Sequence, residues 1–194
     1  MPTIALHSPR TATIDTLRSD RASVPLQAAG VVGFALLTGL LAQFEIRLYL
    51  WEVPISLQTV AVYGAGLALG SRNGFLALVL YLVLGLFLPF YAGGASGVAH
   101  LVGATGGYLV GMALAAAVIG AVSERFNTFA GSVLSVLAGS AVLFTCGVTW
   151  LHVAAGHATW WQSIDAGWLR FVVWDLTKVL FVSALYTGAR RLTA

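Results

Sequence analysis

Charged side chains are missing from four long, largely apolar stretches of the chain. These stretches cover residues 22–44, 53–71, 73–123 and 126–164. Each is at least as long as the roughly 18 apolar residues that span a bilayer as a helix, and the two longest exceed one span. Apolar and polar positions do not alternate with a period of two, so barrel strands are not indicated. The pattern predicts an all-α integral membrane protein that crosses the bilayer several times.

Six transmembrane helices in a compact bundle fit these stretches once they are divided at glycine and proline. Gly70 and Gly74 bracket a predicted tight turn around Arg72, and Pro89 ends the third helix. Pro54 suits the first turn of the second helix, where a missing N–H costs little. The predicted helices cover residues 28–44, 55–69, 75–88, 98–122, 129–151 and 168–188.

The helices are predicted to form one transmembrane domain over residues 25–189. Residues 1–24 contain no apolar segment typical of a signal peptide, so they are predicted to be a cytoplasmic tail. Residues 190–194 form a short C-terminal tail. With six spans and both termini in the cytoplasm, seven arginines fall on the cytoplasmic side and two on the outer side, which agrees with the excess of positive charge in cytoplasmic segments. The cytoplasmic set is Arg10, Arg18, Arg21, Arg72, Arg125, Arg190 and Arg191, and the outer set is Arg47 and Arg170.

Composition excludes several classes of protein. Hydrophobic residues make up 59% of the 194 residues and charged residues 9%, and the mean hydropathy is +0.89. Soluble domains carry about 25% charged residues, so a soluble domain is excluded. The net charge of +3 comes without a basic cluster that would bind nucleic acid. The chain contains no phosphate-binding P-loop motif, so any ATP-driven work belongs to other chains.

Asp175 and Lys178 are charges that fall within a predicted span. Their spacing of three residues puts them on one face of the sixth helix. Charged groups inside a membrane are costly and commonly mark a functional site. Two interpretations are open. The two groups neutralise each other as a buried ion pair, or they line a pocket open to the outer side, where one accepts hydrogen bonds and the other supplies a cation.

Glycines flank the predicted start of the fourth helix. They occur in the loop over residues 91–97, which includes Gly93 and Gly94, and again over residues 103–108. Glycine lets backbone amides approach a ligand closely. Tyr108 adds an aromatic ring with a polar tip. These residues are candidates for ligand contact, although glycine is also frequent in membrane helices.

Two further candidates lie near the predicted outer ends of helices. Gln58, followed by Thr59, stands just inside the outer end of the second helix. Trp150 belongs to a group of tryptophans near the outer interface. Anchoring among lipid headgroups is the ordinary role of such tryptophans, and contact with a ligand is the alternative.

An intramembrane protease is a less favoured alternative. The sequence GASG at residues 94–97 has the G-x-S-G form found in six-helix intramembrane serine proteases. That chemistry needs a histidine close to Ser96, which in those enzymes comes from the last core helix. The predicted sixth helix contains no histidine, although His100 is one turn from Ser96. His152 and His157 lack the spacing of metal ligands. No metal ion or cofactor is predicted.

Taken together, several motifs resemble the BioY family of biotin transporters. They are VPISLQT at residues 53–59, LPFYAGG at 88–94, GATGGYL at 103–109, GVTWL at 147–151 and DLTK at 175–178. The resemblance spans residues 25–185 in the expected order. It implies a six-helix substrate-binding subunit, the S component of an energy-coupling-factor (ECF) transporter, that captures biotin from outside a bacterial cell. It also implies partners, namely a transmembrane coupling subunit and ATPase subunits.

The resemblance implies that Asp175, Lys178, Tyr108 and the Gly93-Gly94 loop face the ligand. Asp175 could accept from the ureido N–H groups of biotin, and Lys178 or an arginine could pair with its carboxylate. The chain departs from the family pattern at Ala104 and at Val173-Trp174, where proline and Pro-Gly are usual. The second departure puts a bulky ring beside Asp175 and is expected to alter the pocket. An S component for another vitamin, such as thiamine or riboflavin, is the alternative.

Overall fold

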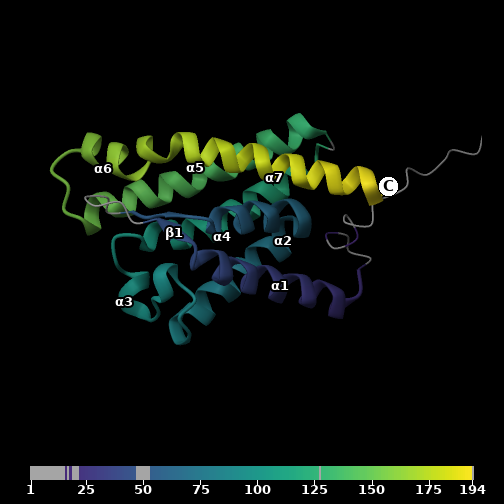
Figure 1. The fold of residues 1–194 in the computed structure, drawn as a ribbon, viewed down its shortest axis with the longest axis horizontal. Helices are drawn as coiled ribbons and strands as arrows, with labels where there is room; N and C mark the ends of the chain where they lie inside the picture. The colour runs from purple at the N-terminus through teal and green to yellow at the C-terminus, as the bar shows by residue number, and fades with distance from the viewer. Residues whose placement is uncertain (1–15, 17, 19–21, 47–52, 127, 194) are drawn as a thin grey trace, which may run out of the picture.

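Five long helical elements run roughly along the long axis of the molecule (Figure 1). The computed structural model describes residues 16, 18, 22–46, 53–126 and 128–193. The long elements are α1 (Val24–Ala42), α2 (Gln58–Phe87), α4 (Gly106–Ser123), α5 (Phe129–Ala154) and α7 (Val172–Thr193). The short elements are β1 (Glu45–Ile46), β2 (Ile55–Ser56), η2 (Ala92–Gly94), α3 (Val98–Leu101), α6 (Trp160–Gly167) and η3 (Leu169–Phe171). In Figure 1, β1, α3 and α6 gather at the end of the bundle opposite the C-terminus, which we call the α6 end.

α2 is a helical hairpin. Gly70 interrupts it with a φ of 75°, a conformation that glycine adopts without the clash of a Cβ. Beyond Gly70 the chain folds back, so that Gly74 lies against the backbone of Ala65. Nε2 of Gln58 then donates to the hydroxyl of Tyr81 at 2.9 Å, although the two residues are 23 positions apart. The turn predicted over residues 70–74 is therefore a break at Gly70, and the helix continues through Arg72.

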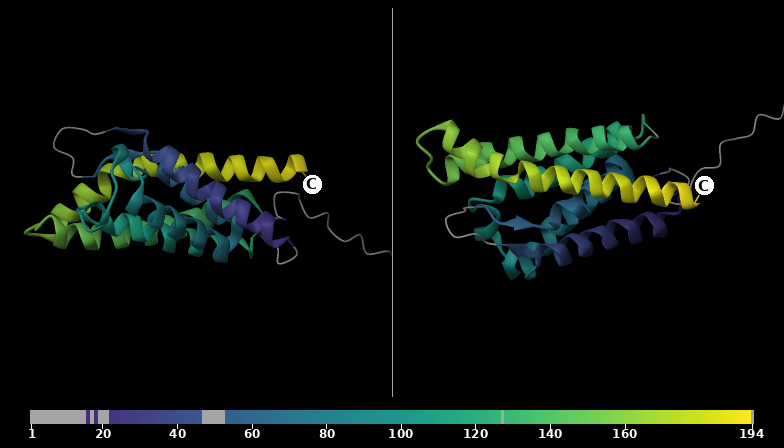
Figure 2. Two further views of the ribbon diagram at one scale, coloured as in Figure 1. Left: turned by 90° about the horizontal axis from the view of Figure 1, so that it is seen from below. Right: turned by 45° about the horizontal axis from the view of Figure 1, so that its top comes forward.

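Close packing holds the centre of the bundle together. α4 packs against α2 and α5, while α1 packs against α2, and α7 against α5 and α2. α1 lies at the edge of the bundle (Figure 2). A Cβ on Gly66 would meet the side chain of Ile119, and a Cβ on Gly120 would meet the backbone of Gly70 and Ser71. Glycine at these positions brings α2 and α4 into backbone contact, as small residues commonly do between membrane helices.

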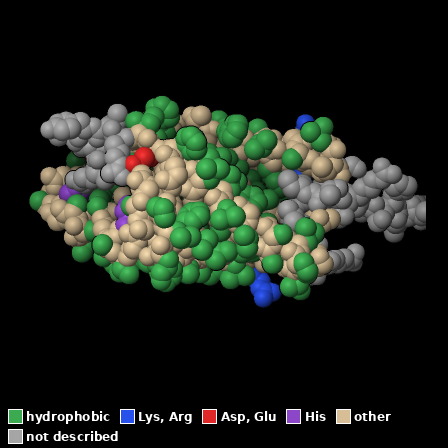
Figure 3. Space-filling view, turned by 60° about the horizontal axis from the view of Figure 1, so that its bottom comes forward, with side chains coloured by type: hydrophobic (Ala, Val, Ile, Leu, Met, Phe, Trp, Pro, Cys, Tyr) green, Lys and Arg blue, Asp and Glu red, His purple; other side chains and the backbone are tan. Residues whose placement is uncertain are grey.

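The outer surface is that of a membrane protein. Within the described part of the chain, four stretches are long and apolar enough to cross a bilayer: Val24–Ala42, Gln58–Gly94, Gly106–Ser123 and Phe129–Ala154. α7, which carries Asp175 and Lys178, is not one of the four. Large apolar side chains such as Leu40 and Leu185 are exposed. In Figure 3, hydrophobic side chains cover much of the visible face, and charged side chains lie toward its two ends. The helical class of the prediction is confirmed, and the four stretches are candidate membrane spans by their length and composition.

Two predicted helix boundaries near the α6 end are wrong. The second helix begins at Gln58, because residues 55–56 form β2 and pair antiparallel with β1. Pro54 therefore precedes a strand and does not occupy a helical turn. The predicted helix over residues 98–122 is broken into α3 and α4, because the chain turns between Leu101 and Gly106. Gly106 approaches the carbonyl of Leu101 too closely to leave room for a Cβ.

The connection before the last helix is more ordered than predicted. It contains α6, whose first turn is closed by a capping box between Thr159 and Gln162. The short helix η3 follows, so α7 begins at Val172 and not at residue 168. At its other end α7 continues to Thr193, five residues beyond the predicted end.

Arginines lie at both ends of the bundle. The guanidinium of Arg18 donates to Oγ of Ser123 at 2.8 Å and to the hydroxyl of Tyr186 at 2.6 Å, which ties it to the C-terminal parts of α4 and α7. Arg170 pairs with Asp165 at the α6 end, with 2.6 Å between Nη2 and Oδ2. Of the other arginines used in the prediction, Arg10, Arg21 and Arg47 lie outside the described residues, as does most of the predicted tail over residues 1–24.

Candidate functional site

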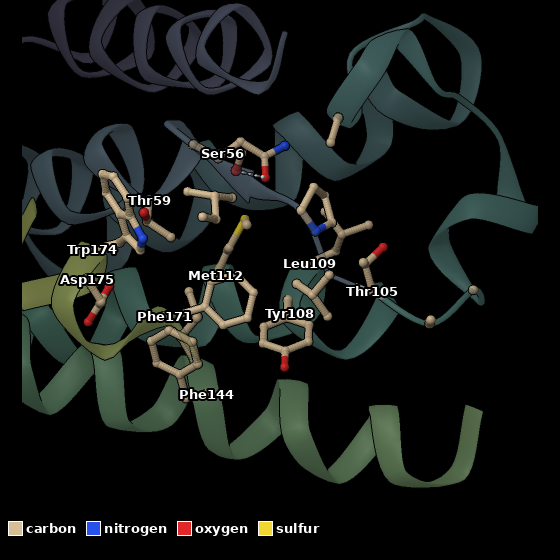
Figure 4. Close-up of a pocket in the computed structure, with 18 of the residues that line it drawn as sticks. Ser56, Thr59, Thr105, Tyr108, Leu109, Met112, Phe144, Phe171, Trp174 and Asp175 are labelled. Carbon is tan, nitrogen blue, oxygen red and sulfur yellow. Dashed lines mark hydrogen bonds between the residues drawn. The ribbon is translucent and has the colours of Figure 1, made fainter. Parts of the chain in front are cut away.

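A cavity of about 340 Å³ opens between β2, the start of α2, α4, α5 and α7, with further wall residues from η2, α3 and η3. In Figure 4, Asp175 and Trp174 lie at one end of the labelled side chains and Thr105 lies at the other, with Met112 and Phe171 between them. The cavity thus has a charged end and a largely apolar middle. Its volume falls within the range of about 300–1,000 Å³ that is usual for small-molecule sites.

Asp175 is buried at the charged end, with 6% of its surface exposed. Both of its carboxylate oxygens accept hydrogen bonds from hydroxyl groups. Tyr63, from the first half of α2, donates to Oδ1 at 2.5 Å, and Ser140, from α5, donates to Oδ2 at 2.5 Å. The carboxylate therefore connects three helices while it lines the cavity.

Lys178 also lines the cavity, one turn further along α7. Its ammonium group donates to the backbone oxygen of Ser56 at 2.6 Å and to the hydroxyl of Thr59 at 3.0 Å. Between these two described side chains there is no Asp175–Lys178 ion pair within 4.0 Å. The two groups therefore do not form a direct ion pair, because each charge is held by polar groups of its own.

Tyr108 forms the opposite part of the wall. Its hydroxyl donates to the backbone oxygen of Gly167 at 2.7 Å, so α4 is joined to the end of α6. The ring packs edge-to-face on Phe144, with 6.2 Å between centroids, and lies against the backbone of Gly147. A side chain at residue 147 would occupy the space of the Tyr108 ring, which explains the glycine there.

Gln58 lines the cavity beside β2. Its amide nitrogen donates to Tyr81, and its Oε1 accepts from the hydroxyl of Ser56 at 3.2 Å. Of the residues selected from the sequence, Asp175, Lys178, Tyr108 and Gln58 thus come together around one cavity. Thr59, which the sequence places beside Gln58, completes the polar end.

Gly93, Gly94 and Trp150 are not among the residues that line the cavity. Gly93 and Gly94 have φ of 65° and 73°, and they shape the turn whose first residue, Ala92, does line it. The indole N–H of Trp150 donates to the backbone oxygen of Gly103 at 2.8 Å, behind the wall. These three residues shape or support the wall, and the structure gives them no direct access to the cavity.

Several wall residues carry no sequence signal. Met112, Phe144 and Phe171 are apolar residues in apolar helices, and nothing in the pattern separates them from residues that face lipid or the core. Tyr63 and Ser140 do not line the cavity, and only the fold brings them to Asp175. Trp174 lines the cavity with 51% of its surface exposed, so the departure from the family pattern expected beside Asp175 does reach the pocket.

The described histidines contact groups other than Ser96, the serine of the G-x-S-G sequence. Ser96 is exposed, and the ring of His100 stacks on Tyr91 with 5.1 Å between centroids. Nδ1 of His152 and Nδ1 of His157 both lie 2.9 Å from Oγ of Ser163. No observation here favours a protease.

Comparison with known sequences decides the family. A sequence model described as the BioY family matches residues 16–194. The chain belongs to the BioY family. The resemblance seen in the sequence motifs is therefore confirmed, and it extends over nearly the whole chain.

Curated members of the BioY family align along most of this chain. The "Biotin transporter BioY" of Thermotoga maritima is 34% identical over 148 residues, which cover 76% of this chain and 86% of that protein. The "Probable biotin transporter BioY" of Pyrococcus horikoshii is 34% identical over 75% of this chain and 84% of its own length. The "Biotin transporter BioY2" of Lactococcus lactis is 30% identical over 83% of this chain and 86% of its own length.

A solved structure shows the same fold. The chain superposes with a TM-score of 0.78 on a crystal structure of "the S-component for biotin from an ECF-type ABC transporter", with coverage of 87% of this chain and 94% of that one. The sequence identity is 22%, so this likeness concerns the fold. The helices described above therefore share the fold of that protein.

Proposed function

We propose that this chain is the biotin-binding membrane subunit of an ECF-type vitamin uptake transporter, and that it acts as a binding component and not as an enzyme. One observation carries the proposal. In a chain of the BioY family, a cavity of about 340 Å³ places a buried acceptor, Asp175, and a donor, Lys178, at one end of a largely apolar wall. Biotin combines a polar ureido ring with an apolar sulfur ring and chain, which is the arrangement that such a wall would bind.

The proposed ligand contacts follow from the groups in the cavity. Asp175 accepts from a ureido N–H group, and Lys178 donates to the neighbouring ureido oxygen. Both residues are assigned to the ureido ring because they lie one turn apart at the same end of the cavity. The ureido ring and the carboxylate are at opposite ends of biotin, so one residue at each would need a wider separation. Tyr108 and Gln58 line the remaining wall, and the Gly93-Gly94 turn and Trp150 support it from behind.

The proposed setting is the plasma membrane of a bacterial cell, with six spans and both termini in the cytoplasm. The hairpin in α2 supports six spans, because it divides one helical element into two that run back alongside each other. The cavity then opens toward the outer side, at the α6 end. Because the sequence contains no nucleotide-binding motif, the energy for transport would come from a transmembrane coupling subunit and its ATPase subunits.

Calorimetry on the purified chain tests the function. We expect biotin to bind in a saturable manner and to displace labelled biotin, and thiamine and riboflavin to do neither. Native mass spectrometry of the purified protein should show a mass increment equal to one biotin. Absence of heat with biotin, together with absence of competition, would refute the proposal, and binding of another vitamin instead would reassign the substrate.

Lys178→Met is expected to weaken biotin binding at least tenfold, about 1.4 kcal/mol or more. The substitution keeps the length of the side chain and removes its donors to the ligand and to Ser56. Lys178 is assigned to the ureido end, which biotin and its methyl ester share. The substitution should therefore lower the affinity for biotin methyl ester by the same factor as the affinity for biotin. Arg125→Met, which removes an exposed cation outside the cavity, is the control and should bind as the wild type does. Loss for biotin but not for its ester would instead assign Lys178 to the carboxylate.

A further inference from the structure

We propose that Tyr63 and Ser140 are positioning residues, which fix the carboxylate of Asp175 in the one orientation that accepts hydrogen bonds from the ligand. The inference rests on the proposed function, because it concerns how the same site recognises biotin. It adds two residues that never touch the ligand and that lie on helices other than the one carrying Asp175.

The geometry is that of a clamp from two sides. Tyr63 donates to one carboxylate oxygen of Asp175 and Ser140 donates to the other, each at 2.5 Å. Tyr63 is 0% exposed and Ser140 is 6% exposed, so water does not compete for either hydroxyl group. Neither residue lines the cavity, whereas Asp175 does. Any effect of the two hydroxyl groups on the ligand must therefore pass through Asp175.

The clamp leaves acceptor capacity for a ligand. An ionised carboxylate offers about four lone-pair sites, and the two hydroxyl groups occupy one on each oxygen. With both oxygens held, the plane of the carboxylate cannot turn about its last bond without breaking a charge-assisted hydrogen bond. The sites that remain are then fixed in direction, which lowers the cost of ordering the side chain when a ligand binds.

Lys178 does not supply this orientation. Its ammonium group is directed to Ser56 and Thr59 and makes no ion pair with Asp175. In the described structure, Tyr63 and Ser140 are the residues that hold the carboxylate. A site that must accept from a ring N–H group in a fixed direction needs this control, because a freely turning carboxylate would present its oxygens in many directions.

Binding of biotin to single variants of the full-length protein is the first test. Tyr63→Phe and Ser140→Ala each remove one hydroxyl group, and each should weaken biotin binding about tenfold, the usual effect of losing a hydrogen bond to a charged group. Ser140→Thr keeps the hydroxyl group and should restore most of the affinity. In an Asp175→Asn background, Tyr63→Phe should lower the affinity for biotin by less than about twofold further. The Asp175 carboxylate, through which Tyr63 acts on the ligand, is already absent from that protein.

Matched controls separate positioning from general damage. Ser135→Ala removes another buried serine of α5, one that bonds only to its own helix at Gly131. Tyr186→Phe removes a buried tyrosine hydroxyl that contacts Arg18 away from the cavity. Both variants should bind biotin within about twofold of the wild type. Their melting temperatures show how much stability a buried hydroxyl group contributes without any link to Asp175.

A second readout needs no biotin. The chain contains four aspartates, so ¹³C labelling of aspartate side chains gives four carboxyl resonances, and Asp175→Asn identifies the one from Asp175. Tyr63→Phe and Ser140→Ala should each shift that resonance and leave the other three in place. Ser135→Ala and Tyr186→Phe should shift none of the four.

The outcomes separate the two proposals. If the wild type fails to bind biotin, the proposed function is wrong, and the carboxyl resonance alone then decides whether the clamp exists. If the wild type binds biotin while Tyr63→Phe and Ser140→Ala bind it equally well, the clamp does not serve recognition and the inference fails. It also fails if Tyr63→Phe costs as much affinity in the Asp175→Asn background as in the wild type, since that result indicates a purely structural role.

Discussion

Asp175→Asn is expected to weaken biotin binding at least tenfold, the largest effect that we predict for a single atom exchange in this protein. The change preserves the shape of the side chain and replaces one acceptor oxygen by an amide nitrogen, which can only donate. That amide must then face the hydroxyl of Tyr63, the hydroxyl of Ser140 or the ureido N–H groups of the ligand, all of which act as donors to Asp175 in our assignment. In the buried site, a mismatched donor is not compensated by water.

Isothermal titration of the purified variant measures the effect, and Asp165→Asn is the matched control. Asp165 lies at the α6 end, where it pairs with Arg170 and does not line the cavity. The Asp165→Asn protein should bind biotin as the wild type does. An Asp175→Asn protein that is folded and binds biotin with unchanged affinity would show that the ligand lies elsewhere.

Gly120→Val is expected to cause the largest loss of stability. A Cβ at residue 120 would meet the amide nitrogen and Cα of Ser71 and the carbonyl carbon of Gly70, all of them backbone atoms at the tip of the α2 hairpin. A flexible side chain could move aside, but this backbone is fixed by the break at Gly70, so α4 would have to separate from α2. Overpacking commonly costs about 1–3 kcal/mol, and contact with backbone puts this site at or above the upper value.

Thermal unfolding in detergent, followed by size-exclusion chromatography, measures the loss. Gly188→Val is the control, because a Cβ at residue 188 on α7 would meet nothing within 4 Å. That variant should melt at or slightly above the wild-type temperature, since glycine is a poor helix former. Equal melting of Gly120→Val and the wild type would mean that α2 and α4 are not in backbone contact at this point.

The helices of the bundle were predictable because lipid allows few alternatives. Charge-free runs of sufficient length must be helical in a bilayer, and the break at Gly70 could be located from glycine spacing. The break between α3 and α4 could not, because it depends on how closely Gly106 approaches Leu101 in three dimensions. α6 does have a local sequence signal, the capping box that begins at Thr159.

The site was predictable only where polarity made residues unusual. Asp175 and Lys178 stand out against apolar surroundings, so both could be selected from the sequence alone. Their partners could not be, since many hydroxyl-bearing residues occur in these helices and only packing selects Tyr63 and Ser140. Whether Lys178 pairs with Asp175 or with other groups likewise depended on the position of Ser56. That residue belongs to strand β2, where a helix was predicted.

Gln43 joins α1 by hydrogen bonds to the turn next to the cavity wall. From the end of α1, its amide nitrogen lies 3.3 Å from the backbone oxygens of Pro89 and Tyr91, and the next residue, Ala92, lines the cavity. A slide of α1 by one helical turn, about 5.4 Å, exceeds the length of either hydrogen bond. A displacement of this peripheral helix along its axis would therefore break the hydrogen bonds that join it to the turn beside Ala92.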